Sequence, residues 1–371
     1  MLEGCLGIIS FEDIGNEFGA LCKNKPVYML PFAGRYRLVD FTISNMINHG
    51  LCTIAVYTGR KVRSILNHLG DGKPWDLNRK TSGLSIFPPL FDEEKRRSSD
   101  IYQYHTTEEF FTDSKAEYIL IANPNIISKV NLTKVFEHFL DTGADITVVY
   151  KKQRNGDSGY INADSLIIGN DGRFINIGVN LCSKSEFNLF MNMAFIKKGV
   201  FLDIVRMVME TGEDIYFKQA IVNYKDMYKI NSYEFEGHIE YIRGIKSYYD
   251  ANMNLLDKKI YKELFLEGGT ILTRSRDEPS TFYVTNSKVR NSLVANGCII
   301  EGEVEDSILF RGVKVERNAV VKNSILMRGA VVKENSVLIN TILDKHVIVK
   351  KGVNIVGIKS NPYTIEEDMV V

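Results

Sequence analysis

Residues 307–338 read SILFRG-VKVERN-AVVKNS-ILMRGA-VVKENS-VL, a stretch that repeats with a period of six. The first place of each hexad is mostly apolar and holds Ser307, Val313, Ala319, Ile325, Val331 and Val337. The following place holds Val320, Leu326, Val332 and Leu338, and the preceding place is small or short and polar, with Asn318, Ser324, Ala330 and Ser336. This period matches neither an α-helix nor the alternation of a strand. It predicts a triangular solenoid with apolar residues inside and small residues at the corners, which is typical of a left-handed β-helix of hexapeptide repeats.

The hexapeptide pattern begins near Phe282 and divides the chain into regions of different character. We expect an α/β domain over 1–250, a connector over 251–281 and the β-helix over 282–371. A β-sandwich is the alternative for the last region, but it needs turn signals every 8–12 residues or so. The regular hexads therefore favour the solenoid.

Short apolar runs alternate with amphipathic stretches in the first 250 residues. Strands are predicted at Cys5–Ile9, Thr53–Tyr57, Tyr118–Ala122 and Asp145–Tyr150, and helices at Phe41–Asn48, Val62–Leu69 and Leu132–Thr142. Asn131 and Gly143 are suitable caps for the last of these helices. Strands that alternate with helices predict right-handed crossovers and a mostly parallel, Rossmann-like sheet. Ligands of such sheets bind beyond the carboxyl ends of the strands.

The composition excludes several classes of protein. Lys plus Arg and Asp plus Glu both total 46, so the net charge is zero, which argues against a nucleic-acid partner. No apolar run approaches the roughly 20 residues that span a bilayer, and the N-terminus lacks the basic region of a signal peptide. The five cysteines have no CxxC spacing: Cys5, Cys22, Cys52, Cys182 and Cys298. We therefore expect free thiols, no zinc site and a cytoplasmic location.

Two segments near the N-terminus carry a specific resemblance. Residues 25–27 read KPV, and residues 31–45 read PFAGRYRLVDFTISN. Together with KAEYIL at 115–120 and SYYDANMNL at 247–255, they resemble bacterial ADP-glucose pyrophosphorylase, which is glucose-1-phosphate adenylyltransferase. The C-terminal hexapeptide β-helix completes the resemblance, which covers nearly the whole chain. It implies a nucleotidyltransferase fold for the α/β domain.

The family's nucleotide loop has been lost from this chain. The resemblance implies a G-G-x-G-x-R loop whose N–H groups wrap a triphosphate and whose Arg compensates its charge. Here residues 10–15 read SFEDIG, so Gly15 stands at the position of the Arg. The carboxylates of Glu12 and Asp13 would repel a triphosphate. We expect this loop not to hold ATP productively.

The positions that bind metal and sugar phosphate in the family are also altered. Pro124 and Tyr241 stand where the resemblance implies the two Mg²⁺-binding aspartates, and neither offers a carboxylate. Asn180 stands where the family's lysine contacts the sugar phosphate. We therefore expect no catalytic residue, no metal site and no cofactor on this chain, with Mg²⁺ bound instead by a catalytic partner subunit.

Three basic residues remain as candidates for binding the phosphate of a substrate or effector. Lys25 either faces a phosphate-sized pocket or is a solvated loop lysine. Arg35 and Arg37 flank an aromatic residue, and arginine suits phosphate through its planar fork. For Arg37, an ion pair with Asp40 is the competing structural interpretation.

These losses favour a non-catalytic regulatory subunit, the D-type (GlgD) branch of the family, acting in glycogen biosynthesis. It would form a hetero-oligomer, expected to be a tetramer, with a catalytic subunit and respond to a sugar-phosphate effector. The alternative is an active nucleotidyltransferase that makes ADP-glucose from ATP and glucose 1-phosphate with displaced ligands.

Overall fold

The computed structural model describes residues 2, 4–10, 15–79, 82–89, 99–155, 160–169, 172–182 and 185–371. The chain forms two compact units, each assembled from separate stretches. The first unit comprises Met1–Phe11, Thr42–Val62 and Leu69–Gly237, and the second comprises Glu12–Phe41, Arg63–His68 and His238–Val371. Among the described residues, no helix is both long and apolar enough to cross a membrane.

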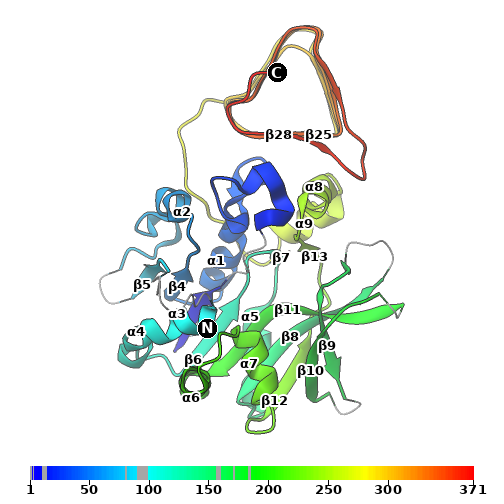
Figure 1. Ribbon diagram of the computed structural model, residues 1–371. Helices are drawn as coiled ribbons and strands as arrows, with labels where there is room; N and C mark the ends of the chain where they lie inside the picture. The colour runs from blue at the N-terminus through cyan, green and yellow to red at the C-terminus, as the bar shows by residue number, and fades with distance from the viewer. Residues whose placement is uncertain are drawn as a thin grey trace. The chain divides into compact units, whose positions relative to one another are not determined.

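The first unit is built on a nine-stranded sheet (Figure 1). Its parallel core has the order β6–β1–β4–β5, formed by β6 (Tyr118–Ala122), β1 (Cys5–Ile9), β4 (Thr53–Tyr57) and β5 (Gly83–Phe87). Every residue of β1 is buried, because a central parallel strand is covered on both faces and therefore reads as an unbroken apolar run. The predicted bounds of β1, β4 and β6 are confirmed.

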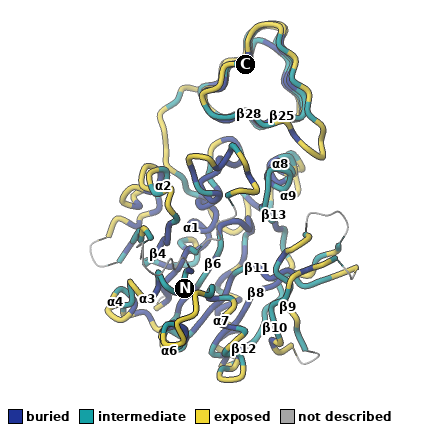
Figure 2. The backbone as a smooth tube through the Cα atoms, viewed as in Figure 1, coloured by how far each residue is buried: buried dark blue, intermediate teal, exposed yellow. Residues whose placement is uncertain are grey.

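The sheet continues beyond β6 with mainly antiparallel strands. They are β11 (Glu186–Lys197), β8 (Ile146–Arg154), β9 (Asp164–Ile168) and β10 (Phe174–Val179), while β12 (Ile230–Glu234) pairs in parallel with β8. The strand predicted at Asp145–Tyr150 is β8, which extends to Arg154. Strands β6 and β8 are dark blue along most of their length in Figure 2, whereas exposed positions gather toward β9 and β10.

Helices surround this sheet at the positions where apolar periodicity predicts them. They are α1 (Leu38–Asn48), α2 (Val62–Leu69), α3 (Asp100–Thr106), α4 (Glu108–Asp113), α5 (Leu132–Asp141), α6 (Lys198–Thr211) and α7 (Phe217–Asn223). The Asn131 side chain accepts a bond from the Lys134 N–H at the start of α5, and Gly143 follows its end with φ of 59°. Helix α1 lies against β1 so closely that a Cβ on Gly7 would come within 2.7 Å of Met46 Sδ. Glycine at position 7 therefore sets the helix–strand spacing.

A buried carboxylate, Asp100, connects separate elements of the first unit. Its Oδ1 accepts bonds of 2.8 Å from the backbone N–H groups of Phe217 and Ile101. The hydroxyls of Ser10 and Tyr104 lie 3.5 Å and 3.4 Å from its Oδ2. Burial raises the pKa of Asp100 to about 6, although these hydrogen bonds oppose the shift.

The C-terminal part of the second unit is a β-helix of three parallel five-stranded sheets, seen as a triangle in Figure 1. Each sheet takes one strand from every coil. The first contains β14 (Phe282–Tyr283), β17 (Ile299–Ile300), β20 (Lys314–Val315), β23 (Val331–Val332) and β26 (Ile348–Val349); the second contains β15 (Lys288–Arg290), β18 (Glu303–Glu305), β21 (Val320–Lys322), β24 (Val337–Ile339) and β27 (Asn354–Val356); the third contains β16 (Leu293–Val294), β19 (Ile308–Leu309), β22 (Ile325–Leu326), β25 (Thr341–Leu343) and β28 (Tyr363–Ile365). The predicted β-helix fold is confirmed.

The strict six-residue register is wrong in detail. Val321 pairs with Val304 of the preceding coil and with Leu338 of the following one, so each coil is one residue shorter than three full hexads. Two sides of the triangle keep the hexad spacing and the third is one residue shorter, as the starts of β20, β21, β22 and β23 show. Val321 is therefore the buried residue of its strand, and Val320 is half-exposed.

The corners of the coils are turned by residues with positive φ. The corner prediction is right for Asn318, with φ of 57°, and one residue late elsewhere, because Asn323, Gly329 and Asn335 adopt the left-handed conformation. Asparagine and glycine tolerate this conformation at little steric cost. Beside one corner, buried hydroxyls form a ladder: Ser307 Oγ accepts from the Ser324 N–H at 3.1 Å, and Ser324 Oγ accepts from the Thr341 N–H at 3.2 Å. The ladder satisfies backbone donors in the interior.

The second unit also contains shorter elements: β2 (Pro31–Phe32), β3 (Tyr36–Arg37), β13 (Ile239–Tyr241), α8 (Ile245–Asn254), α9 (Lys258–Phe265) and the 3₁₀ helices η1 (Gly15–Cys22) and η2 (Val27–Met29); β7 (Ile126–Ser128) and η3 (Lys73–Trp75) lie in the first unit. Tyr249 of α8 donates to Asn323 O at 2.7 Å. Asn252 Oδ1 accepts from the Ala33 N–H at 3.1 Å. These bonds fix the 31–37 segment relative to the β-helix.

Candidate functional site

A large basic cavity lies within the second unit. Its volume is about 1010 Å³, and nine lysine or arginine side chains line it against two acidic ones. The basic residues are Lys25, Arg35, Arg37, Arg63, Arg274, Arg276, Arg311, Arg328 and Lys345, and the acidic residues are Glu367 and Asp368. Such an excess of positive charge in a concave site favours an anionic ligand. The three basic candidates from the sequence, Lys25, Arg35 and Arg37, are all among these residues.

Lys25 is a buried, ion-paired residue rather than a solvated loop lysine. Its side chain is 3 % exposed, and its ammonium lies 2.6 Å from Asp344 Oδ2. Glu367 Oε2 lies farther away, at 3.9 Å. The buried charge of Lys25 is therefore compensated by carboxylates of the last coil.

Arg37 is held by backbone contacts rather than by the predicted ion pair with Asp40. Its guanidinium donates to Met29 O at 2.7 Å, and only its backbone N–H donates to Asp40, at 2.9 Å. The Asp40 carboxylate instead contacts His68 Nε2 at 2.6 Å. Burial lowers the pKa of the Arg37 guanidinium, Asp40 opposes this shift, and Arg276 and other nearby arginines add to it. Arg35 is exposed, and its guanidinium lies 5.4 Å from the centroid of the Tyr36 ring.

Sequence reasoning missed the cations that the β-helix contributes. Arg311, Arg328 and Lys345 follow one another at intervals of one coil, so they form a column on the cavity wall. The backbone agrees, because the Gly329 N–H donates to Arg311 O at 3.0 Å and the His346 N–H donates to Arg328 O at 3.0 Å. A search for cations at the coil repeat is the signal that would have found them.

Like charges crowd one another in this cavity. Burial lowers the pKa of Arg311, and Arg35, Arg276 and Arg328 lower it further, while Glu278 at 3.6 Å partly compensates. Repulsion among fixed cations is relieved when an anion binds between them. The cavity is therefore suited to a phosphate-bearing ligand.

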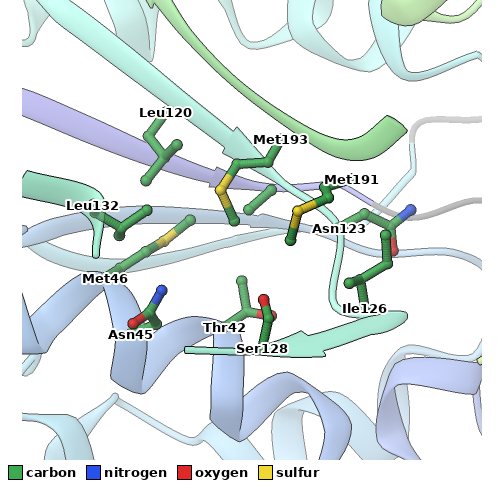
Figure 3. A pocket seen from close by; sticks show the side chains of 11 residues that line it. Thr42, Asn45, Met46, Leu120, Asn123, Ile126, Ser128, Leu132, Met191 and Met193 are labelled. Atoms are coloured by element: carbon green, nitrogen blue, oxygen red, sulfur yellow. The ribbon is translucent and has the colours of Figure 1, made fainter. Parts of the chain in front are cut away.

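The first unit shows what has become of the position at Pro124. This buried proline follows β6 in an Asn-Pro-Asn turn, in which Asn123 Oδ1 accepts from the Asn125 N–H at 2.9 Å. The neighbouring cavity has a volume of only about 10 Å³. Figure 3 shows Met46 reaching it from α1, and Met191 and Met193 from β11. That space admits about one water molecule, so this cavity excludes a sugar phosphate.

Asn180 has a structural role at the position where the resemblance implies a lysine. Its amide is buried, donates to Asn155 Oδ1 at 2.7 Å and to Tyr160 O at 3.0 Å, and accepts from the Cys182 N–H at 3.0 Å. An amide that is committed to the loop in this way replaces the charge of the lysine with local hydrogen bonding. Neutral Asn180 therefore offers no cation to a phosphate.

Tyr241 and Gly15 lie in the second unit. Arg243 Nη1 donates to Tyr241 Oη at 3.2 Å, and the guanidinium lies 5.9 Å from the ring centroid. Gly15 begins the 3₁₀ helix η1. The predicted repulsion by Glu12 and Asp13 concerns positions outside the described residues.

Comparison with known proteins finds two family matches along the chain. Residues 15–177 match the nucleotidyl transferase family, and residues 279–362 match the GlmU-like C-terminal hexapeptide family. The glycogen biosynthesis protein GlgD of Bacillus subtilis is 30% identical over 318 residues, which cover 85% of this chain and 82% of that protein. Its Geobacillus stearothermophilus counterpart is 31% identical over 321 residues, covering 85% and 82%. A glucose-1-phosphate adenylyltransferase of Clostridium botulinum strain Alaska E43 is 33% identical over 319 residues, covering 83% and 81%.

The chain belongs to the glucose-1-phosphate adenylyltransferase family. The family resemblance implies Mg²⁺ held by aspartates, and the residues of this chain do not fit that ion. Pro124 offers no oxygen ligand from its side chain, and the hydroxyl of Tyr241 accepts a bond from a guanidinium. Magnesium requires hard oxygen ligands, usually including a carboxylate, and a neighbouring Arg243 cation opposes its binding.

Proposed function

We propose that this chain is a non-catalytic regulatory subunit of glucose-1-phosphate adenylyltransferase that acts in glycogen biosynthesis in the cytoplasm. The observation that carries the proposal is a contrast within the molecule. The two metal positions of the family hold Pro124 and Tyr241, whereas the basic cavity holds nine cations. Chemistry has been lost while a charged binding site is kept.

The proposed partner is a catalytic homologue, which would supply the Mg²⁺ site and the nucleotide loop. The two chains would assemble as a hetero-oligomer, a tetramer in the simplest arrangement. A sugar-phosphate effector in the basic cavity would favour one conformation of the assembly. One subunit changes the rate of another only when it has different free energies of contact with the two conformational states of its neighbour.

Two measurements test the proposal. The purified chain alone, supplied with ATP, glucose 1-phosphate and Mg²⁺, is expected to make no ADP-glucose above background. Mixed with a catalytic homologue at micromolar concentration, it is expected to co-elute on size exclusion and to change the maximal rate or substrate affinity. Robust turnover by the pure chain contradicts the proposal. Separate elution with unchanged partner kinetics contradicts it equally.

A further inference from the structure

The C-terminal turn places acidic side chains at the basic cavity. Residues 366–368 read Glu-Glu-Asp, and Glu367 and Asp368 line the cavity. Glu367 bridges two of the nine cations: its Oε1 lies 3.0 Å from Lys345 Nζ, and its Oε2 lies 3.9 Å from Lys25 Nζ. One carboxylate therefore occupies the space between two ammonium groups that a phosphate would otherwise contact.

The backbone on both sides of Glu367 is anchored. Before it, the Asp344 N–H donates to Ile365 O at 3.0 Å. After it, the Asp368 N–H donates to Lys345 O at 3.0 Å, and Val370 forms a bridge with Ile348. The turn is thus part of the last coil, so only the Glu367 side chain has to rotate to leave the lysines.

The electrostatics agree with an internal counter-ion. Burial alone would raise the pKa of Glu367, but Lys345 and Lys25 lower it, so the carboxylate is charged at neutral pH. Burial and the neighbouring Lys25 lower the pKa of Lys345, and Glu367 opposes that shift. The three groups form one coupled cluster at the edge of the cavity.

We propose that Glu367 is an intramolecular competitor for the anionic ligand and sets the affinity of the basic cavity. A phosphate group that enters at Lys25 and Lys345 must first displace the Glu367 carboxylate, which returns when the ligand leaves. The arginines, which this turn does not neutralise, bind the anion first. This inference rests on the anion-binding part of the proposed function and adds the residue that tunes it.

The test compares two substitutions of equal charge in the same turn. Glu367→Gln removes the competing charge and keeps the shape of the side chain. Glu366→Gln makes the same change in net charge one residue away, at a side chain that pairs with the exposed Lys23 and does not line the cavity. Inorganic phosphate is titrated by calorimetry into each full-length variant at constant ionic strength, with circular dichroism to confirm folding.

Glu367→Gln is expected to bind phosphate about tenfold more tightly than the wild type, and Glu366→Gln within about twofold of it, because only the former charge repels the ligand at contact distance. Glu367→Asp keeps the charge and is expected to bind like the wild type. Arg328→Gln, which alters the cavity itself, is expected to weaken binding in either background.

The contrary outcomes separate the two levels of inference. If Glu367→Gln binds no more tightly than Glu366→Gln while Arg328→Gln weakens binding, Glu367 is not a competitor and the anion site stands. If no variant binds phosphate, or if Arg328→Gln binds as the wild type does, the anion site itself is wrong and the competitor falls with it.

Discussion

The buried Asp100 carboxylate offers the sharpest prediction about stability, through the variant Asp100→Asn. Oδ1 accepts two backbone N–H bonds, and the amide oxygen of asparagine can keep both. The new NH₂ group faces the hydroxyls of Ser10 and Tyr104, each of which can accept a bond. The substitution therefore removes the charge with little change in packing.

The magnitude follows from the shift in pKa. The pKa of Asp100 is raised from 3.8 to about 6, with burial as the largest cause. Folded protein therefore binds the proton more tightly than unfolded protein, and stability falls as pH rises from about 4 to about 6. A shift of about two units corresponds to about 3 kcal/mol lost at neutral pH. Asp100→Asn avoids this loss.

The assay is urea unfolding of the full chain at pH 4.5, 6.0 and 7.5. Asp100→Asn is expected to be more stable than the wild type at pH 7.5, by up to about 3 kcal/mol, and nearly equal to it at pH 4.5. Asp113→Asn, at an exposed position of α4, serves as the matched control and should change little at any pH. A difference between Asp100→Asn and the wild type that stays constant across these pH values would refute the reasoning.

Three further substitutions test other parts of the structure. Lys25→Met should lower the free energy of unfolding by about 3–5 kcal/mol, because it leaves the Asp344 carboxylate buried without its partner; urea unfolding measures this loss. Gly302→Ala should destabilise the β-helix by about 1–3 kcal/mol, since the new Cβ would lie 2.3 Å from Ala319 O; thermal unfolding shows it as a lower midpoint. Pro124→Asp should leave ADP-glucose synthesis at background, because each missing charge-stabilising group typically costs about 10²–10³ in rate.

Each of these three has a control. Asp344→Leu added to Lys25→Met should recover much of the lost stability, and failure to recover it would mean that the pair is not the cause. Gly199→Ala, where a new Cβ meets no atom within 4 Å, should be neutral in the same thermal assay. Tyr241→Asp added to Pro124→Asp should still be inactive, since Arg243 would pair with the new carboxylate; clear activity would contradict the account of the metal positions.

Local patterns were sufficient for the elements whose causes are local. The runs at Cys5–Ile9 and Tyr118–Ala122 are strands because a central parallel strand is apolar on both faces. The helix after Asn131 begins where its side-chain cap is available. The six-residue period identified the β-helix, but the exact length of a coil depends on how its corners close, and corner geometry is not visible in hydrophobicity.

Most of the candidate site arises from contacts between distant segments. Lys25 and Arg37 were found because one short motif contains them, whereas Arg311 and Arg328 lie in the β-helix, where a lone cation has no local signature. Asp40 was assigned to its near neighbour in sequence, but its partner is His68, on a separate helix. Burial of Lys25 depends in turn on the last coil, which supplies Asp344.

The fixed length of the coil also constrains how this protein can change during evolution. Loss or duplication of a single residue within a coil would turn every later core position outward, so the β-helix can shorten or lengthen safely only by whole coils. Removal of positions 324–340, for example, would bring Thr341 to the place of Ser324 and preserve the hydroxyl ladder. The same event would delete Arg328 from the column of cations. Gain or loss of a coil is thus one inherited step that alters architecture and ligand charge together.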